Sequence, residues 1–333
     1  MKYRRLGASA LQVSELCLGT MMFGDQTAAD EAASIVALAR ERGVNFVDTA
    51  DVYMSGASES MLGPLIRGDR DRWVLATKVG NKMSNRPNES RYSRKWIVQS
   101  VEGSLARLGT DYLDIYYLHR DFESDSLEEP LRALDDLIRA GKIRCWGLSN
   151  FRGWRISEAV WLARDLNMPG PVVCQPYYNL LNRMPEVEIL PACARYGLGV
   201  ATYSPIARGV LTGKYDPSAP PPQGSRAARG DTRMHQTEWR PESLAIAQRL
   251  KEHAHGRHGN LLRLAVAWIL ANRTVSSVIA GPRTLAQFED YFPALECAWS
   301  AEDEALVDSL VAPGHPSTPG YSDPSYPFYG RRI

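Results

Sequence analysis

Four polar residues of types that can move a proton follow three apolar runs of the chain. The residues are Asp48, Tyr53, Lys78 and His119, and the runs span 44–47, 73–77 and 113–118. Each run is rich in β-branched and aromatic residues, and helical patterns separate the runs, which indicates buried parallel strands. Because parallel strands end on one side of a sheet, we expect the four side chains to converge there.

This quartet is suited to donating a proton to a substrate oxygen. A tyrosine ordinarily loses its proton near pH ~10 and is a sluggish acid at neutral pH unless a cation stabilises the phenolate. Lys78 is the candidate cation, and Asp48 is placed to keep its ammonium group charged. His119 could orient a carbonyl group or relay a proton. Taken singly, each residue also fits a structural role as a cap, a spacer or a core histidine.

The size and charge of the chain favour one large domain and a small substrate. A length of 333 residues is ordinary for a single α/β barrel, so one domain over 1–333 is the economical expectation. Lys plus Arg is 39 and Asp plus Glu is 38, which gives a net charge of +1. Because no overall field attracts nucleic acid or an anionic membrane, a small molecule is the expected partner. The sequence leaves a homo-oligomer open.

The cysteines and the N-terminus indicate a cytoplasmic protein. The five cysteines are odd in number, widely spaced and mostly within apolar patterns, as expected for buried thiols in a reducing compartment. The first residues lack an apolar stretch of signal-peptide length. No run approaches the ~18 apolar residues needed to span a bilayer, so we expect a soluble, unprocessed chain.

The order of elements predicts an α/β fold, a parallel (β/α)₈ (TIM) barrel preceded by a short hairpin. Helical patterns such as 32–42, 94–108 and 127–140 alternate with the predicted strands, with Ser93 as an N-cap and Gly109 as a C-terminal stop. A doubly wound sheet is the alternative, but the chain has no G-x-G-x-x-G, and 209–214 is too short for a P-loop. Eight strands are expected, at 15–20, 44–50, 73–79, 113–119, 143–150, 172–178, 199–205 and 275–281.

Two stretches interrupt this alternation. Residues 215–240, after the seventh strand, form a long irregular segment rich in proline, glycine and arginine, of the kind that serves as a lid or a binding loop. Residues 313–333 form a C-terminal tail with interleaved aromatics, which are Tyr321, Tyr326, Phe328 and Tyr329.

Three histidines close together raise the question of a metal. On a helix, only His255 and His258 of the set His253, His255 and His258 share a face. No acidic residue nearby in the sequence completes a ligand set, so we expect no metal.

The catalytic candidates also lie in motifs that resemble those of the aldo-keto reductase family. Segment 48–53 resembles the beginning of its first signature, and Lys78 and His119 match its other two catalytic positions. The first signature continues with Gly56, Ser58, Glu59, Leu62 and Gly63, and further matches are 147–150, Gln175, 203–205, Gly209, 213–214, 225–226, Gly281, Arg283 and Gln287. The resemblance covers nearly the whole chain. Within the family, the chain resembles the branch of the bacterial aldo/keto reductases and the β subunits of potassium channels.

The resemblance implies a (β/α)₈ barrel that binds NADP(H) across its rim without a Rossmann domain. It makes Tyr53 the proton donor, Lys78 and Asp48 its tuning pair, and His119 the group that orients the carbonyl. Ser149, Asn150 and Gln175 would hold the carboxamide, and Tyr203 would stack on the nicotinamide. The other cofactor contacts that it implies are Thr20, Met21, Asp48, Ser204, Pro205, Ile206, Gly209, Lys214, Arg226, Gly281, Arg283, Gln287, Asp290 and Tyr291.

Arg226 and Arg283 are suited to a terminal phosphate and an adenine face, because guanidinium groups both fork onto phosphate and stack. Where the family commonly has Glu followed by Asn, this chain has Asp290 and Tyr291. The expected substrate contacts are Met22, Phe23, Tyr53, Met54, His119 and Arg120.

These observations favour an NADPH-dependent reductase of aldehydes or ketones. A regulatory subunit that binds NADP(H) with little turnover is the alternative. A third reading, a lyase or aldolase with Lys78 as a Schiff-base nucleophile, needs a lowered lysine pKa, which Asp48 would oppose.

Overall fold

The computed structural model describes residues 1–327, so Phe328 and Tyr329 of the predicted aromatic tail lie outside the described residues. The chain forms two compact units. The first, called here the barrel unit, comprises Met1–Pro176, Glu188–Tyr203 and Arg273–Glu289. The second unit comprises Tyr177–Val187, Ser204–Asn272 and the residues from Asp290 onward. The single domain over 1–333 remains a prediction.

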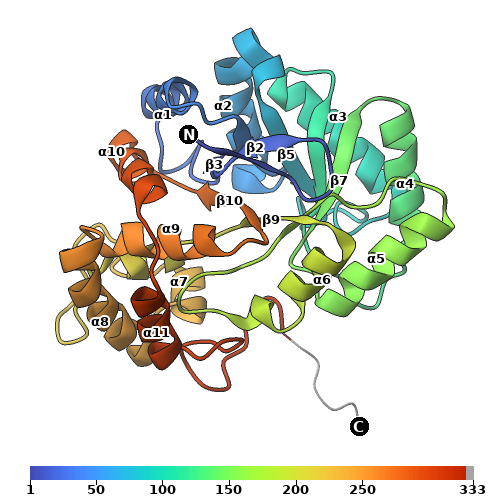
Figure 1. Ribbon diagram of the computed structural model, residues 1–333. Helices are drawn as coiled ribbons and strands as arrows, with labels where there is room; N and C mark the ends of the chain where they lie inside the picture. The colour runs from blue at the N-terminus through green and yellow to red at the C-terminus, as the bar shows by residue number, and fades with distance from the viewer. Residues whose placement is uncertain (328–333) are drawn as a thin grey trace. The chain divides into compact units, whose positions relative to one another are not determined.

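Eight parallel strands close into a barrel within the barrel unit, which confirms the predicted fold class (Figure 1). Neighbouring strands follow one another in sequence, and β10 closes the ring by pairing with both β9 and β3. The strands are β3 (Leu16–Gly19), β4 (Phe46–Asp48), β5 (Val74–Val79), β6 (Leu113–Leu118), β7 (Ile143–Ser149), β8 (Val173–Gln175), β9 (Gly199–Thr202) and β10 (Val275–Ala280).

The two strands that differ most from the predicted bounds end three residues early. β8 stops at Gln175 rather than near residue 178, and β9 stops at Thr202 rather than near residue 205. Pro176 follows β8 directly, and a proline has no N–H to donate to a neighbouring strand. Ser204 has a left-handed backbone with φ 55°, which is incompatible with extended β-structure and turns the chain after β9.

Helices alternate with these strands in the barrel unit, and the predicted ends of one of them are confirmed. The side chain of Ser93 accepts a hydrogen bond from the backbone N–H of Trp96, and Gly109 takes a left-handed backbone at the C-terminus of α3. The helices are α1 (Ala29–Glu41), η1 (Tyr53–Gly56), α2 (Ala57–Ile66), η2 (Arg67–Arg72), α3 (Arg94–Leu108), α4 (Glu128–Arg139), α5 (Gly153–Asp165), α6 (Ile189–Tyr196) and α10 (Leu285–Glu289).

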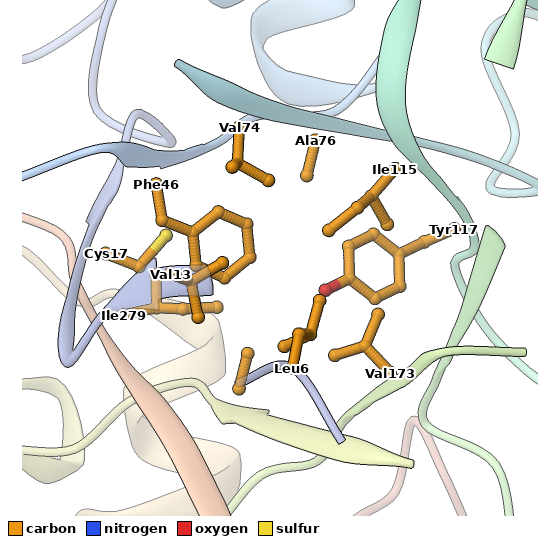
Figure 2. Close-up of a cluster of buried hydrophobic side chains, with 11 residues drawn as sticks. Leu6, Val13, Cys17, Phe46, Val74, Ala76, Ile115, Tyr117, Val173 and Ile279 are labelled. Atoms are coloured by element: carbon orange, nitrogen blue, oxygen red, sulfur yellow. The ribbon is translucent and has the colours of Figure 1, made fainter. Parts of the chain in front are cut away.

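The predicted N-terminal hairpin contributes to the buried core. Strands β1 (Tyr3–Arg5) and β2 (Gln12–Ser14) pair antiparallel. Leu6 and Val13 of this hairpin pack with barrel side chains such as Phe46 and Tyr117, as Figure 2 shows. A Cβ atom at Gly199 would lie 2.8 Å from the backbone nitrogen of Gly7, so the close approach of hairpin and β9 requires a glycine there.

The second unit is helical and includes residues 215–240, within which the helix α7 forms, and the described part of the C-terminal tail. Within 215–240, Tyr215 is buried and meets the Trp239 ring edge-on at 5.1 Å. The described part of the tail docks in the same unit, where the Arg240 guanidinium lies 3.7 Å from the Tyr321 ring centroid. The elements are η3 (Met184–Glu186), η4 (Ala207–Thr212), α7 (Thr232–Thr237), α8 (Pro241–Arg257), α9 (Leu261–Ala271), η5 (Phe292–Glu296) and α11 (Ala301–Leu310). None of the helices within residues 1–327 combines the length and apolar character needed to cross a membrane.

Candidate active site

Lys78 is the centre of the predicted quartet. Its side chain is fully buried on β5, and Nζ donates to Asp48 Oδ1 at 2.5 Å and to Tyr53 Oη at 3.2 Å. A third hydrogen bond runs from Nζ to the carbonyl oxygen of Thr49 at 2.7 Å. Asp48 is the last residue of β4, and Tyr53 begins η1 five residues later. The three side chains therefore lie in contact, as their positions at or beyond the ends of strands predict.

The ammonium group of Lys78 remains charged in this buried place. Burial alone would lower its pKa, but the carboxylate of Asp48 and the hydroxyl of Tyr53 outweigh that effect, and the pKa is raised. The ammonium nitrogen also lies 4.8 Å from the centroid of the Tyr53 ring. A fixed positive charge beside the phenol favours the phenolate, so this arrangement can lower the cost of releasing the Tyr53 proton.

His119 faces Tyr53 from the end of the next strand. It follows β6 directly, and its ring meets the Tyr53 ring edge-on, with centroids 6.0 Å apart. Burial lowers the pKa of His119 well below its usual value, with smaller contributions from the charges of Lys78 and Arg120. The imidazole is therefore neutral at physiological pH. Its Nδ1 is buried without a hydrogen-bond partner among residues 1–327.

Amide and hydroxyl groups gather at the ends of β7 and β8. Ser149 pairs with Gln175 in the strand register, and its Oγ donates to the carbonyl oxygen of Gln175 at 3.0 Å. Asn150 has a left-handed backbone with φ 61° and donates from Nδ2 to the carbonyl oxygen of His119 at 2.8 Å. Tyr203 donates from Oη to Asn150 Oδ1 at 2.7 Å. The predicted nicotinamide-binding residues thus form one hydrogen-bonded group.

Ser58 and Glu59 of the first signature hold in place the elements that carry the quartet. Ser58 donates from Oγ to the carbonyl oxygen of Thr20 at 2.7 Å, which ties α2 to the chain after β3. The buried Glu59 accepts from Thr77 Oγ1 at 2.5 Å and from Arg107 Nε at 2.6 Å. Because Thr77 precedes Lys78 on β5, this pair anchors the strand that carries the lysine.

The loops after β5 and β6 pack on each other beside the quartet. Tyr92 Oη donates to the carbonyl oxygen of Arg120 at 2.5 Å, and its ring meets Phe122 edge-on at 5.2 Å. Gly80 has φ 127°, and a Cβ atom there would lie 2.4 Å from the Tyr92 ring. Only glycine therefore allows this loop to close over the strand end.

The predicted substrate residues differ in exposure. Met22 and Phe23 are buried, Met54 is exposed, and Tyr53 and Arg120 are half-buried. The structure therefore places only some of these side chains where an incoming molecule can reach them directly. Their contact with substrate remains a prediction.

The predicted cofactor residues of the barrel unit lie near the ends of β3 and β10. Thr20 is buried and donates from Oγ1 to the carbonyl oxygen of Asp48 at 3.2 Å, and Met21 is exposed. Gly281 directly follows β10. Arg283 is half-buried, and its backbone N–H donates to Gln287 Oε1 at 3.0 Å.

The other predicted cofactor residues belong to the second unit. The chain after Ser204 bends through positive φ angles of 47° and 50° at Ala207 and Arg208, which is strain of a kind that clusters at functional loops. Gly209 follows with φ 99°, a conformation that glycine adopts readily. In the same unit, Arg226 Nη1 lies 3.7 Å from Asp231 Oδ2, and Tyr291 is buried. The remaining members are Pro205 (buried), Ile206 (half-buried), Lys214 (exposed) and Asp290 (exposed).

Two further residues at this site were not singled out from the sequence. Thr49 contributes a backbone carbonyl to Lys78, which no side-chain pattern could indicate. Asp51 is buried and accepts a hydrogen bond from Ser100 Oγ at 2.9 Å. Burial raises the pKa of Asp51 to about 7, against the opposing effect of the Ser100 hydrogen bond. Its position between Asp48 and Tyr53 in the signature was the available signal.

Comparison with known proteins identifies the same family as the motifs that contain the site residues. The model of the aldo/keto reductase family matches residues 15–312. The chain is 38% identical over 301 residues to a probable voltage-gated potassium channel subunit beta of Arabidopsis thaliana, covering 89% of this chain and 92% of the relative. It is 35% identical over 335 residues to the uncharacterized oxidoreductase YrpG of Bacillus subtilis (strain 168), covering 97% of this chain and all of the relative.

A second plant relative, from Oryza sativa subsp. japonica, has the same name as the Arabidopsis protein and is 38% identical over 319 residues, covering 94% of this chain and 96% of the relative. The chain belongs to the aldo/keto reductase family. Membership of this family supports an oxidoreductase that acts on carbonyl compounds with a nicotinamide dinucleotide.

Proposed function

We propose that the chain reduces aldehyde or ketone carbonyls to alcohols with NADPH, and that Tyr53 is the proton donor. The observation that carries the proposal is the position of Lys78 Nζ, which contacts Asp48 Oδ1 and Tyr53 Oη while its side chain is fully buried. A carbonyl, NADPH and one proton give an alcohol and NADP⁺. The reverse reaction uses the same groups.

The residues of the barrel unit supply the proton and its control. When bound, NADPH supplies the hydride. Tyr53 passes its Oη proton to the carbonyl oxygen as negative charge develops there, and Lys78 stabilises the phenolate that remains. Asp48 keeps the ammonium group charged. The neutral imidazole of His119 can donate an N–H to the carbonyl oxygen beside Tyr53 without adding a second positive charge.

The donor set at the ends of β7 and β8 fits a nicotinamide ring. Ser149, Asn150 and Gln175 offer hydroxyl and amide groups, and together these can satisfy both the donor and the acceptor atoms of a carboxamide. The aromatic ring of Tyr203 is held to this group by its hydrogen bond to Asn150. The half-buried guanidinium of Arg283 is suited to a 2′-phosphate, which NADPH has and NADH lacks.

A regulatory role with little turnover is the second candidate. It is favoured by two relatives of similar length that are named as probable potassium channel β subunits. Schiff-base chemistry at Lys78 is disfavoured, because a nucleophilic lysine needs a lowered pKa. Here Asp48 and Tyr53 outweigh the effect of burial, and the pKa of Lys78 is raised.

The deciding experiment follows NADPH absorbance with panels of aldehydes, sugars, steroids and polycyclic ketones, with alcohol formation measured in parallel. We expect turnover of about 1 s⁻¹ or faster with at least one class. Tight NADPH binding with turnover slower by orders of magnitude for every class would favour the regulatory role. A reaction without carbonyl serves as the control for uncoupled oxidation.

A further inference from the structure

A second cluster of ionisable side chains lies in the second unit, between α8 and α11. His253 lies near the end of α8, His258 directly follows that helix, and Asp303 lies in the first turn of α11. The ligating atoms of the three side chains all lie within 4.8 Å of one another. No role in the proposed reaction involves these residues.

Both histidines direct the same ring atom at the same carboxylate oxygen. His253 Nε2 lies 2.6 Å from Asp303 Oδ1, and His258 Nε2 lies 3.2 Å from that oxygen. The exposed fractions of the three side chains are 17%, 5% and 2% for His253, His258 and Asp303. The acidic partner, which was sought near the histidines in the sequence and not found there, is Asp303, 45 residues after His258. Asp303 is distant in sequence, so sequence spacing could not indicate it.

The carboxylate of Asp303 is held in one orientation. Its other oxygen, Oδ2, accepts from the backbone N–H of Ser300 at 3.0 Å and from Ser300 Oγ at 2.6 Å, in a capping box at the start of α11. Burial would raise the pKa of Asp303, but hydrogen bonds from Ser300, His253 and His258 outweigh it and hold the pKa below its usual value. The group is anionic at neutral pH, and Oδ1 is the oxygen directed at the two imidazoles.

We propose that His253, His258 and Asp303 form a binding site for a divalent transition metal, with Zn²⁺ as the best match. Two imidazole nitrogens and one carboxylate oxygen are a ligand set that zinc accepts, with bonds of ~2.0–2.2 Å and a fourth position left for water. In a tetrahedral site such ligands lie about 3.3 Å apart. The 3.2 Å separation of His258 Nε2 and Asp303 Oδ1 already matches this spacing. The 2.6 Å separation of His253 Nε2 and Asp303 Oδ1 has to lengthen by less than about 1 Å, since an ion would replace the proton between these atoms. The two imidazole nitrogens, which lie within 4.8 Å of each other, have to approach the same spacing of about 3.3 Å.

One neighbouring cation opposes the ion. Arg257 Nε lies 3.4 Å from Asp303 Oδ1, and its Nη1 lies 2.7 Å from Glu302 Oε2. Glu302 can retain the guanidinium when an ion binds Asp303. The site would join α8 to α11, so its expected effect is to stabilise the second unit and not to take part in carbonyl reduction.

The test uses the full chain without an affinity tag, freed of metal by a chelator and titrated with Co²⁺, whose visible absorption reports the coordination. We expect one Co²⁺ per chain, displaced by Zn²⁺, with binding that releases protons and therefore tightens as the pH rises. His253→Asn and His258→Asn should each weaken binding by at least about 100-fold. His255→Asn is the matched control, because His255 lies on the same helix with its side chain exposed, and it should bind as the wild type does.

Two further readouts separate a metal site from a hydrogen-bonded contact between the helices. Zn²⁺ should raise the melting temperature of the wild type and leave that of His258→Asn unchanged. Arg257→Gln should bind Co²⁺ about tenfold more tightly, because it removes a positive charge beside the ion. The absence of saturable binding, equal weakening by His255→Asn, or no gain in Arg257→Gln would overturn the proposal.

Discussion

Gln175 and Asp48 are joined by a hydrogen bond from Gln175 Nε2 to Asp48 Oδ2 at 2.8 Å. The other oxygen of this carboxylate, Oδ1, accepts from Lys78. The carboxylate is therefore fixed from both sides, by an ammonium from β5 and an amide from β8. Since Gln175 also belongs to the predicted carboxamide-binding set, one side chain connects the proposed proton-donating residues with the proposed cofactor contacts.

Gln175→Leu should lower kcat by about 10 to 100-fold, because a buried Asp48 oxygen loses its donor at a cost of ~1–3 kcal/mol. The expected signature of a positioning role is a shifted pH profile of kcat. NADPH affinity, measured by fluorescence quenching, should fall as well if the amide holds the carboxamide. A weaker affinity with an unaltered kcat and pH profile would leave Gln175 as a cofactor contact only.

Lys78→Met should reduce kcat by at least about 100-fold, because the phenolate of Tyr53 loses its stabilising charge. It should also lower the free energy of unfolding by ~3–5 kcal/mol, since Asp48 is left as a buried, unpaired carboxylate. Lys82→Met, at an exposed lysine of the next loop, is the control for both measurements. Equal turnover of wild type and Lys78→Met from mildly acidic to mildly alkaline pH would remove Lys78 from the mechanism.

The stability of the fold should depend on pH through His119. Burial lowers the pKa of His119, so below about pH 6.5 the unfolded chain binds a proton at this residue that the folded chain does not. The free energy of unfolding should therefore fall as the pH falls, by up to ~1.4 kcal/mol per unit, until the lowered pKa is reached. His119→Gln should flatten this dependence in urea titrations, whereas the exposed His255→Gln should retain it. An unaltered slope in His119→Gln would mean that other groups cause the acid sensitivity.

Arg283→Ala should affect the affinity for NADPH and not the affinity for NADH. If the guanidinium pairs with the 2′-phosphate, NADPH should bind more tightly than NADH by roughly 1.5 to 3 kcal/mol per charge-assisted contact, or about 10 to 150-fold. The substitution should weaken NADPH and leave NADH nearly unchanged, as measured by fluorescence titration at constant ionic strength. Arg273→Ala, at an exposed arginine of the barrel unit, should alter neither affinity. Equal affinities of the wild-type chain for NADPH and NADH would contradict the phosphate assignment.

The sequence predicted the barrel and the quartet because both depend on local patterns. Apolar runs predicted the eight strands. The positions of Asp48, Lys78 and His119 at or near strand ends predicted that these side chains converge. The bond between Gln175 and Asp48 was not predicted, because it joins residues 127 positions apart and depends on side-chain direction after the barrel closes. The pairing of Asp303 with two histidines was missed for the same reason, since only tertiary packing brings α11 beside the end of α8.

The most direct test of the proposed function is kcat of Tyr53→Phe with NADPH and the best carbonyl found in the panel, under conditions where chemistry limits the rate. The substitution removes the proton and keeps the ring, so fold and NADPH affinity should be retained. We expect kcat to fall by ~10² to 10⁴-fold. A variant that keeps more than about a tenth of the wild-type kcat would show that Tyr53 is not the acid.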